Sequence, residues 1–297
     1  MSVPTREAGQ LKGHEGAVHV VAYNSTGQYC LSGGQDRRIV LWNPSTKTPI
    51  QVYKAHGYEV LDVSVLQDNS QFVSCGGDRT VYVWDVATGH TIKRFVGHLA
   101  RINSVSYNQD GSVIASGSFD STVRLWDCKS NSRHPIQILD EAADGISSVQ
   151  IRGHEIITGS VDCRVRAYDL RMGRVVSDMI GASISSIRQS KDDNTILVST
   201  LDSKLRLMDK SNGEMLRTFS GHIHKEYRLR SVFGPRDETI ISGSEDGRIC
   251  IWDIEEGKLV YQLENGHDGR VVTCVAVHPR GTQMLSCGVN GTIQIWD

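Results

Sequence analysis

The side chains here that could perform chemistry are histidine, serine and aspartate, which together form the catalytic set of many hydrolases. The 297-residue chain contains 11 His. A catalytic set occurs once, in a cleft, but here His, Ser, Asp and Trp recur in one register. The four sets are His14, Ser32, Asp36 and Trp42; His56, Ser74, Asp78 and Trp84; His98, Ser116, Asp120 and Trp126; and His222, Ser242, Asp246 and Trp252. This repetition favours a structural role, and we expect no enzymatic activity and no catalytic residues.

An aromatic or apolar residue followed by Asp or Asn occurs seven times, at intervals of 40 to 44 residues. These pairs begin at Trp42, Trp84, Trp126, Tyr168, Met208, Trp252 and Trp296. Within one unit, residues 102–107, 113–116 and 123–126 are apolar and β-branched, which is typical of short strands. A tight turn at Asp120 separates the last two of these segments. The elements that position the polar sets are therefore predicted to be repeated antiparallel strands.

The repeats resemble the WD-repeat family, in which each unit supplies four strands of a propeller blade. The resemblance implies an all-β, seven-bladed β-propeller forming one domain over residues 1–297. Approximate repeats are 13–52, 55–94, 97–138, 139–178, 181–219, 221–263, and 266–297 together with 5–12. The last repeat ends after its third strand, so we expect the N-terminal segment to complete that blade and close the ring. The family resemblance also implies that each His, Ser, Asp and Trp set forms a hydrogen-bonded chain.

Repeats four and five depart from this pattern. Leu139-Asp140 replaces the expected Gly-His in repeat four, and Tyr168 and Met208 replace Trp. Repeat seven keeps His267, Ser286 and Trp296 but has Asn290 in place of Asp. Weaker internal networks predict that blades four and five open first.

The family register predicts a partner-binding face around the propeller axis. Its candidate residues are His19, Glu59, Leu61, Arg101, Asn103, Phe119, Arg228, Arg230 and Arg270. We expect the four arginines to converge on one side of this face. Arg and aromatic residues anchor many protein interfaces, so the pattern favours a peptide with acidic or phosphorylated groups. The alternative is that these arginines are only solvated surface residues.

Composition excludes several other classes. The formal net charge of −2 argues against a general nucleic-acid binder, and we expect no direct sequence-specific nucleic-acid binding. The seven cysteines include no C-x-x-C pair, so neither a zinc site nor a disulfide framework is indicated. No apolar run is long enough to cross a membrane, and the N-terminus has no signal-peptide pattern. We expect a soluble, monomeric propeller with no cofactor, no metal, no small-molecule substrate and no membrane insertion.

Four stretches that depart from the repeat consensus, residues 55–62, 139–149, 159–173 and 201–210, resemble one branch of the WD-repeat family. This resemblance implies a non-enzymatic scaffold or adaptor in cytoplasm and nucleus. Its implied protein partners are components of a mitogen-activated protein kinase cascade, of the spliceosome, or of both.

The segment Tyr168-Asp169-Leu170-Arg171 resembles the Trp-Asp-x-Arg box by which some propellers dock to ligase adaptors. It implies an alternative function, a substrate receptor of a cullin-RING ubiquitin ligase that uses Arg171. The bland interpretation is that Arg171 pairs with nearby carboxylates on the rim.

Overall fold

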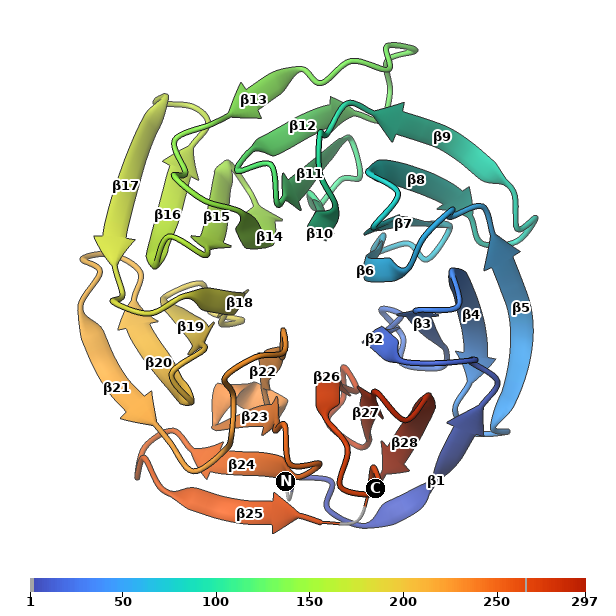
Figure 1. Ribbon diagram of the computed structural model, residues 1–297, viewed down its shortest axis with the longest axis vertical. Coiled ribbons are helices and arrows are strands. Elements are labelled where there is room, and N and C mark those ends of the chain that lie inside the picture. The colour runs from blue at the N-terminus through green and yellow to red at the C-terminus, as the bar shows by residue number, and fades with distance from the viewer. Residues whose placement is uncertain (1–2, 265) are drawn as a thin grey trace.

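The computed structural model describes residues 3–264 and 266–297; Met1, Ser2 and Asn265, which fall within the predicted domain, lie outside the described residues. The described chain forms seven four-stranded antiparallel sheets. They are arranged as blades around a central axis (Figure 1). The predicted all-β, seven-bladed propeller is confirmed.

The first strand of each blade lies at the axis and the fourth at the rim (Figure 1). Blades one to three contain β2 (Val18–Tyr23), β3 (Cys30–Gly34), β4 (Arg38–Asn43), β5 (Thr48–Lys54), β6 (Val60–Val65), β7 (Gln71–Gly76), β8 (Thr80–Asp85), β9 (Thr91–Val96), β10 (Ile102–Tyr107), β11 (Val113–Ser118), β12 (Val123–Asp127) and β13 (Gln137–Leu139). Blades four and five contain β14 (Ile146–Arg152), β15 (Glu155–Ser160), β16 (Arg164–Asp169), β17 (Arg174–Met179), β18 (Ile184–Gln189), β19 (Thr195–Thr200), β20 (Lys204–Asp209) and β21 (Met215–Phe219). Blades six and seven contain β22 (Ser231–Phe233), β23 (Thr239–Gly243), β24 (Ile249–Asp253), β25 (Leu259–Leu263), β26 (Val272–Val277), β27 (Met284–Gly288), β28 (Thr292–Trp296) and β1 (Glu7–Lys12).

The N-terminal strand closes the ring, as the sequence predicts. β1 pairs with β28 in antiparallel register, with Leu11 opposite Ile293. The backbone N–H groups of Thr5 and Arg6 donate to the Asp297 carbonyl at 3.2 and 3.0 Å. Figure 1 shows the two ends of the chain close together at this blade. The described strands therefore form a closed circle of blades.

The hydrophobic core lies between neighbouring blades. Tyr53 on the outer strand of blade one contacts Phe72 and Trp84 of blade two, with ring centroids 4.8 and 5.6 Å apart. All three side chains are almost completely buried. Each blade thus covers the apolar face of the next, so none buries its core alone.

The turn between the second and third strands has the same backbone in all seven blades. The residue after the turn Asp or Asn has a positive φ, in the left-handed region that favours glycine. These residues are Arg37, Arg79, Ser121, Cys163, Ser203, Gly247 and Gly291. Only blades six and seven place glycine there, so the other five blades hold a strained side chain at the turn.

The helical content is one short 3-10 turn, η1 (Pro235–Asp237), within the described residues. No helix among them is long and apolar enough to cross a membrane.

Candidate partner-binding surface

The hydrogen-bonded chain of blade three shows how the repeated residues position a surface loop. Trp126 Nε1–H donates to Ser116 Oγ at 2.8 Å, and Ser116 Oγ lies 2.8 Å from His98 Nε2. His98 Nδ1 lies 2.9 Å from Asp120 Oδ2. That carboxylate oxygen also accepts the backbone N–H of Leu99 at 2.8 Å. The chain therefore connects the buried Trp to the loop before β10.

Blades one and two repeat this arrangement. Its members are His14, Ser32, Asp36 and Trp42, and His56, Ser74, Asp78 and Trp84. Asp36 and Asp78 accept the backbone N–H groups of Glu15 and Gly57 at 3.1 and 3.0 Å. These polar groups stabilise the turns because nearly all of them are paired.

Charge in the blade-three chain is confined to its carboxylate end. Burial by itself raises the pKa of Asp120, but hydrogen bonds from His98 and Thr122 outweigh it and hold the pKa well below its usual range. Burial lowers the pKa of His98. The chain is thus a neutral imidazole beside an ionised carboxylate, and it presents no nucleophile to solvent.

Blade six corrects the prediction of a fourth identical chain. Trp252 Nε1–H donates to the Ser220 carbonyl at 2.9 Å instead of to Ser242. Asp246 pairs with Arg248, whose Nε lies 2.7 Å from Oδ2. Both ring nitrogens of His222 are buried without a hydrogen-bond partner among the described residues. An arginine in this place does not by itself exclude the chain, since Arg38 of blade one donates to Asp36 at 2.8 Å while His14 keeps its contact with that carboxylate.

Blade seven forms the chain with an amide in place of the carboxylate. His267 Nδ1 lies 3.2 Å from Asn290 Oδ1, and His267 Nε2 lies 2.8 Å from Ser286 Oγ. Trp296 Nε1–H donates to the same Ser286 Oγ at 2.9 Å. An amide oxygen accepts from the imidazole as a carboxylate does, although without its charge.

Blades four and five contain a network that the sequence analysis missed. Arg166 donates through Nη2 to Asp162 Oδ2 at 2.6 Å and through Nη1 to Ser160 Oγ at 2.8 Å. Arg206 makes the same Nη2 contact with Asp202 Oδ2 at 2.6 Å. These arginines replace the His and Trp of the other blades. The signal in the sequence was the combination of an arginine four residues after the turn Asp with the absence of the Gly-His pair, which repeat three retains.

The same carboxylates are strongly acidic. Burial by itself raises the pKa of Asp162, but hydrogen bonds from Arg166 and Ser160 outweigh it and lower the pKa to about 2. The pKa of Asp202 is lowered to about 2 in the same way by Arg206 and Thr200. Blade four therefore holds a buried ion pair and blade five an ion pair with a buried arginine, whereas burial lowers the pKa of the imidazoles of His14 and His98 in blades one and three.

Exposed apolar side chains gather on the loops that the chains of blades two and three anchor. Leu99 is 76% exposed, Tyr58 64% and Phe119 47%. The Arg101 guanidinium carbon lies 4.8 Å from the centre of the Phe119 ring, within cation–π distance. Of the four, the sequence analysis singled out only Arg101 and Phe119. We call Tyr58, Leu99, Arg101 and Phe119, together with Arg37 and Arg79, the upper patch.

Arg37 and Arg79 connect the upper patch from blade to blade. Arg37 Nη1 donates to the Gly57 carbonyl, next to Tyr58, at 3.4 Å. Arg79 Nη1 donates to the Leu99 carbonyl at 3.4 Å. Both arginines are exposed and occupy the left-handed turn position. The sequence signal was their place directly after a turn Asp.

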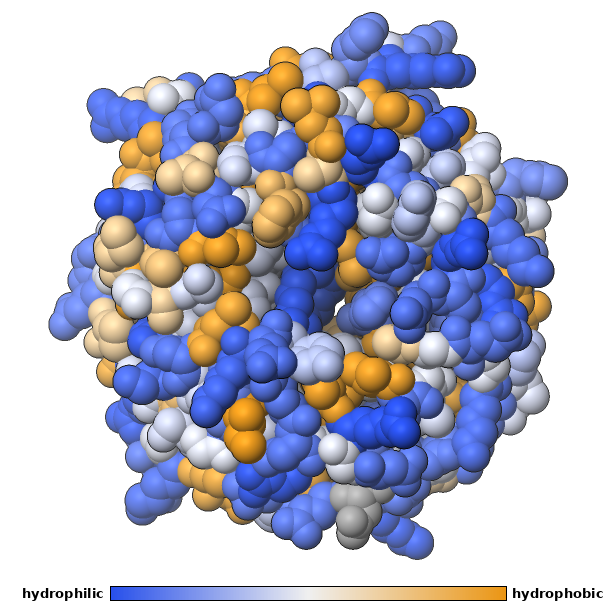
Figure 2. Space-filling view, viewed as in Figure 1, coloured by the Kyte–Doolittle hydropathy of each residue, from blue (hydrophilic) through white to orange (hydrophobic). Residues whose placement is uncertain are grey.

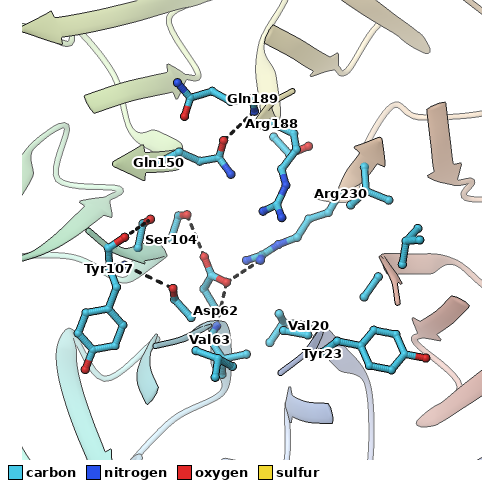
Figure 3. Close-up of a pocket in the computed structure, with 18 of the residues that line it drawn as sticks. Val20, Tyr23, Asp62, Val63, Ser104, Tyr107, Gln150, Arg188, Gln189 and Arg230 are labelled. Carbon is cyan, nitrogen blue, oxygen red and sulfur yellow. Dashed lines mark hydrogen bonds and ion pairs between the residues drawn. The ribbon is translucent and has the colours of Figure 1, made fainter. Parts of the chain in front are cut away.

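Arg228 and Arg230 do not lie on the accessible face, which corrects the prediction that four arginines converge there. Arg230 crosses the central axis from blade six, and its Nη1 lies 2.5 Å from Asp62 Oδ1 of blade two. Arg228 Nη1 donates to the Asn103 carbonyl of blade three at 2.6 Å. Figure 3 shows Arg230 pointing across the channel toward Asp62. Two guanidinium groups thus span the channel instead of facing a partner.

The remaining predicted residues have separate surroundings. Asn103 is buried, with its amide donating to the Ile146 carbonyl at 2.7 Å. Glu59 and Leu61 are partly buried, and the Leu61 carbonyl accepts from Arg230 at 2.9 Å. Burial lowers the pKa of His19, which is also partly buried.

Arg270 is exposed, but it belongs to blade seven, three blades around the ring from Phe119. Of the nine predicted residues, the structure therefore brings Arg101 and Phe119 together at the surface.

The loop before β22 forms a second exposed feature. Glu245 Oε1 accepts three consecutive backbone N–H groups, those of Lys225, Glu226 and Tyr227, at 2.8, 2.7 and 2.9 Å. Tyr227 remains exposed. The carboxylate holds this loop in one conformation.

Arg171 lies on the rim, with 65% of its side chain exposed and its Nε 3.9 Å from Asp169 Oδ1. Asp169 Oδ1 also accepts the backbone N–H groups of Arg171 and Met172 at 2.9 and 3.1 Å. The guanidinium is accessible to a partner. No group of three or more His, Cys, Asp or Glu side chains in the described ranges is arranged to hold a metal ion.

Comparison with known proteins agrees with this architecture. The sequence profile of the family described as "WD domain, G-beta repeat" matches residues 5–43, 47–85, 89–127, 213–253 and 257–297, more than half of the chain. The chain belongs to the WD-repeat family. The profile leaves residues 128–212 unmatched, the segment in which arginine replaces the imidazole chain.

WD-repeat relatives cover nearly the whole chain. The rat protein named WD repeat domain-containing protein 83 is 52% identical over 294 residues, which span 99% of this chain and 92% of that protein. The human protein of the same name is 53% identical over the same shares. A Schizosaccharomyces pombe protein, named Uncharacterized WD repeat-containing protein C713.05, is 48% identical over 280 residues, 94% of each chain. WD-repeat propellers are generally protein-interaction scaffolds without catalytic activity.

Proposed function

We propose that this WD-repeat propeller is a non-enzymatic scaffold that binds protein partners through the upper patch. The observation that carries the proposal is the set of exposed apolar side chains, Tyr58, Leu99 and Phe119, on loops anchored by internal hydrogen bonds. A preorganised loop loses little conformational entropy on binding, so its apolar side chains contribute more of their burial to affinity. Aromatic and arginine residues are the side chains that most often dominate interface energetics.

The charge of the upper patch supports an acidic or phosphorylated partner segment. Arg37, Arg79 and Arg101 are exposed beside these apolar residues. Arginine pairs with carboxylate and phosphate groups through two parallel hydrogen bonds, which gives both energy and specificity. Binding of such a segment should weaken as salt increases, because exposed charges are screened.

The partner class rests on resemblance. Four stretches outside the repeat consensus are similar to a branch of the family associated with the spliceosome and with mitogen-activated protein kinase cascades. We propose spliceosomal components as the principal partners, with kinase-cascade components second, and a distribution between nucleus and cytoplasm.

The test is quantitative affinity purification of the wild-type chain beside two variants. Arg101→Glu with Phe119→Ala removes the centre of the upper patch, and Arg280→Glu changes an exposed arginine on a turn at the other end of the inner strands. We expect spliceosomal proteins to be depleted at least about tenfold with the first variant, the loss typical of an interface anchor, and retained with the second. Unchanged recovery of spliceosomal and kinase-cascade proteins with the first variant would overturn the proposal.

A second candidate function rests on Arg171. Its exposed guanidinium, beside the exposed side chain of Met172, supports docking to an adaptor of a cullin-RING ligase. Purified adaptor should bind the wild-type chain and the Arg174→Ala variant but not Arg171→Ala. Equal binding to all three, or to none, would exclude the substrate-receptor function.

A further inference from the structure

The central channel contains more positive than negative charge. Three arginines reach it, Arg188 from blade five and Arg228 and Arg230 from blade six. Their nearest carboxylate is Asp62, which is nearly buried and pairs with Arg230. Asp62 also accepts Ser104 Oγ–H and the backbone N–H of Val105, at 2.8 and 3.0 Å. The Asp62 carboxylate is thus already hydrogen-bonded through both oxygens. The guanidinium groups of Arg188 and Arg228 have no carboxylate partner among the described residues of the channel.

Arg188 is the unpaired member of this group. No hydrogen bond or ion pair joins its side chain to any described residue, while Arg228 and Arg230 each contact backbone carbonyls across the ring. Figure 3 shows its guanidinium pointing into the channel, next to Arg230 and toward Asp62. Its side chain is exposed although it lies at the middle of the ring. Arg188 therefore faces open space that a ligand can occupy.

The repeat makes this arginine an exception. The fifth residue of each inner strand lies at the same depth along the channel. These residues are Ala22, Ser64, Ser106, Gln150, Arg188 and Ala276, and in the three-residue strand β22 the residue at the same register is Val232. Only Arg188 is charged. Gln150 faces the same space, and because its Oε1 accepts the Gln189 backbone N–H at 2.8 Å, its amide N–H₂ is free to donate.

The positive charge is electrostatically unfavourable without a counter-charge. Although the Arg188 side chain faces open channel, the ring encloses it and limits its hydration; this desolvation, and secondarily the charge of Arg230, lower its pKa. The same two causes lower the pKa of Arg228 to about 9. A bound anion would relieve both effects.

The channel has the size and access for a small ligand. Its volume is about 660 Å³, within the range of about 300–1,000 Å³ common for small-molecule sites. Arg228 and Arg230 cross the channel near the start of the inner strands. The residues that line the channel continue past the C-terminal ends of these strands, to Asn24, Asn108 and Pro279. Figure 2 shows that the ring is hollowed at its centre and that hydrophilic side chains border the opening. The lining residues beyond the strand ends show that the channel also opens where the first and second strands of each blade connect, on the face opposite to the one seen in Figure 2.

We propose that the central channel binds a multivalent oxyanion of the phosphate class, held by Arg188 with Arg230 and Gln150 beside it. A phosphate can accept two parallel hydrogen bonds from the Arg188 guanidinium and a further bond from the Gln150 amide. Lys191 and Arg152 at the channel mouth are positively charged, but the Asp237 carboxylate lines the same mouth and Arg152 also contacts Asp193 at 3.4 Å. The ligand would be inorganic phosphate or a small molecule carrying neighbouring phosphate groups.

The test measures melting temperature and calorimetric binding for the wild-type, Arg188→Gln and Arg280→Gln chains. Each is titrated with phosphate and with pyrophosphate, with chloride as the reference at equal ionic strength. Arg280 is exposed and lies just outside the channel lining, so its variant loses the same charge at the same end of the ring. Arg188→Gln should melt no lower than wild type in chloride, because it removes an unpaired charge.

We expect phosphate to raise the melting temperature of the wild-type and Arg280→Gln chains, and Arg188→Gln to weaken phosphate binding about tenfold to a hundredfold, the loss expected for one charge-assisted contact. A larger effect of pyrophosphate would identify a ligand with neighbouring phosphates, and equal effects would identify phosphate itself. Equal binding by the wild-type and Arg188→Gln chains, or no effect beyond chloride, would overturn the proposal.

A second measurement uses the wild-type chain alone. Phenylglyoxal modifies accessible arginines, and mass spectrometry locates the modified residues. Phosphate should slow modification of Arg188 while Arg280 reacts at an unchanged rate. Equal rates at Arg188 with and without phosphate would also overturn the proposal.

Discussion

Blades three and four are neighbours that stabilise the same turn with different chemistry. In blade three, a neutral imidazole connects Ser116 to the Asp120 carboxylate. In blade four, a buried guanidinium connects Ser160 to Asp162. The turn backbone is the same, with a left-handed residue after each Asp. The difference shows that the blade requires a partner for its turn carboxylate but not a particular residue type.

The imidazole network of blade three and the guanidinium network of blade four hold loops with different exposed side chains. Asp120 accepts the Leu99 N–H and so presents a large apolar side chain to solvent. Asp162 accepts the Ala143 N–H at 2.9 Å, and that loop carries small and acidic residues. The chemistry of the turn is therefore interchangeable, whereas the loop that it anchors differs between the two regions. We infer that blades one to three carry the binding surface for this reason.

The largest expected effect is at the blade-four ion pair. Arg166→Met should lower the free energy of unfolding by about 3–5 kcal/mol, because it leaves a buried carboxylate without its partner. Both side chains are no more than 10% exposed. Urea unfolding measures the change, with Arg174→Met on the exposed outer strand as the control. The double variant Asp162→Asn with Arg166→Met should recover most of the lost free energy of unfolding. If Arg166→Met alone lowers the free energy of unfolding no more than Arg174→Met does, the buried-pair interpretation is wrong.

A smaller loss is expected in blade three. Asp120→Ala removes the acceptor for His98, Thr122 and the Leu99 N–H. The free energy of unfolding should fall by roughly 1–3 kcal/mol, the cost of leaving such donors unpaired. The same unfolding experiment checks it. If Asp120→Ala lowers the free energy of unfolding more than Arg166→Met does, the blade-four network does not stabilise the fold more than the blade-three network.

The stability of blade six should depend on pH in a different range from that of blades four and five. Burial lowers the pKa of His222 to about 4, below its unfolded value of 6.5, so its contribution is fully present above pH 6.5 and is lost as pH falls toward 4. The carboxylates Asp162 and Asp202, with pKa values of about 2, contribute fully above 3.8 and lose that contribution only as pH falls toward 2. The Arg–Asp pairs of blades four and five remove the reason for the sequence-based prediction that these blades open first. Hydrogen exchange, corrected for intrinsic rates, should instead show blade six losing protection relative to blades four and five as pH falls from 7 to 5. A constant ratio of their protection between pH 7 and 5 would contradict this prediction.

The smallest effect is expected at His222. Its ring nitrogens have no hydrogen-bond partner in the described chain, so His222→Leu should change the free energy of unfolding by less than about 0.5 kcal/mol, or raise it. His98→Leu, the matched change in blade three, should cost roughly 1–3 kcal/mol because it breaks a satisfied chain. Equal losses in the two variants would show that blade six forms the same chain as blade three.

The sequence predicted the repeated architecture because the decisive interactions are local. Strands, turns and the pairing within each blade follow from apolar alternation and from a turn Asp at one register, and β1 follows from the strand missing at the end of the last repeat. The hydrogen-bonded His, Ser, Asp and Trp side chains of blades one to three follow from the same repeated register. The sequence analysis was wrong at blade six, where Asp246 pairs with Arg248 and Trp252 donates to the Ser220 carbonyl, contacts that the repeat register does not specify.

Only the tertiary structure decided where the arginines point. Arg230 and Asp62 are 168 residues apart in sequence and meet because the ring brings blades six and two to opposite sides of one channel. A register can assign a residue to the end of a strand, but the direction of a long side chain depends on which charges the closed ring places opposite it. The sequence by itself determined the propeller and its repeated turns. Closure of the ring decided that Arg101 and Phe119 face solvent while Arg188, Arg228 and Arg230 face the channel.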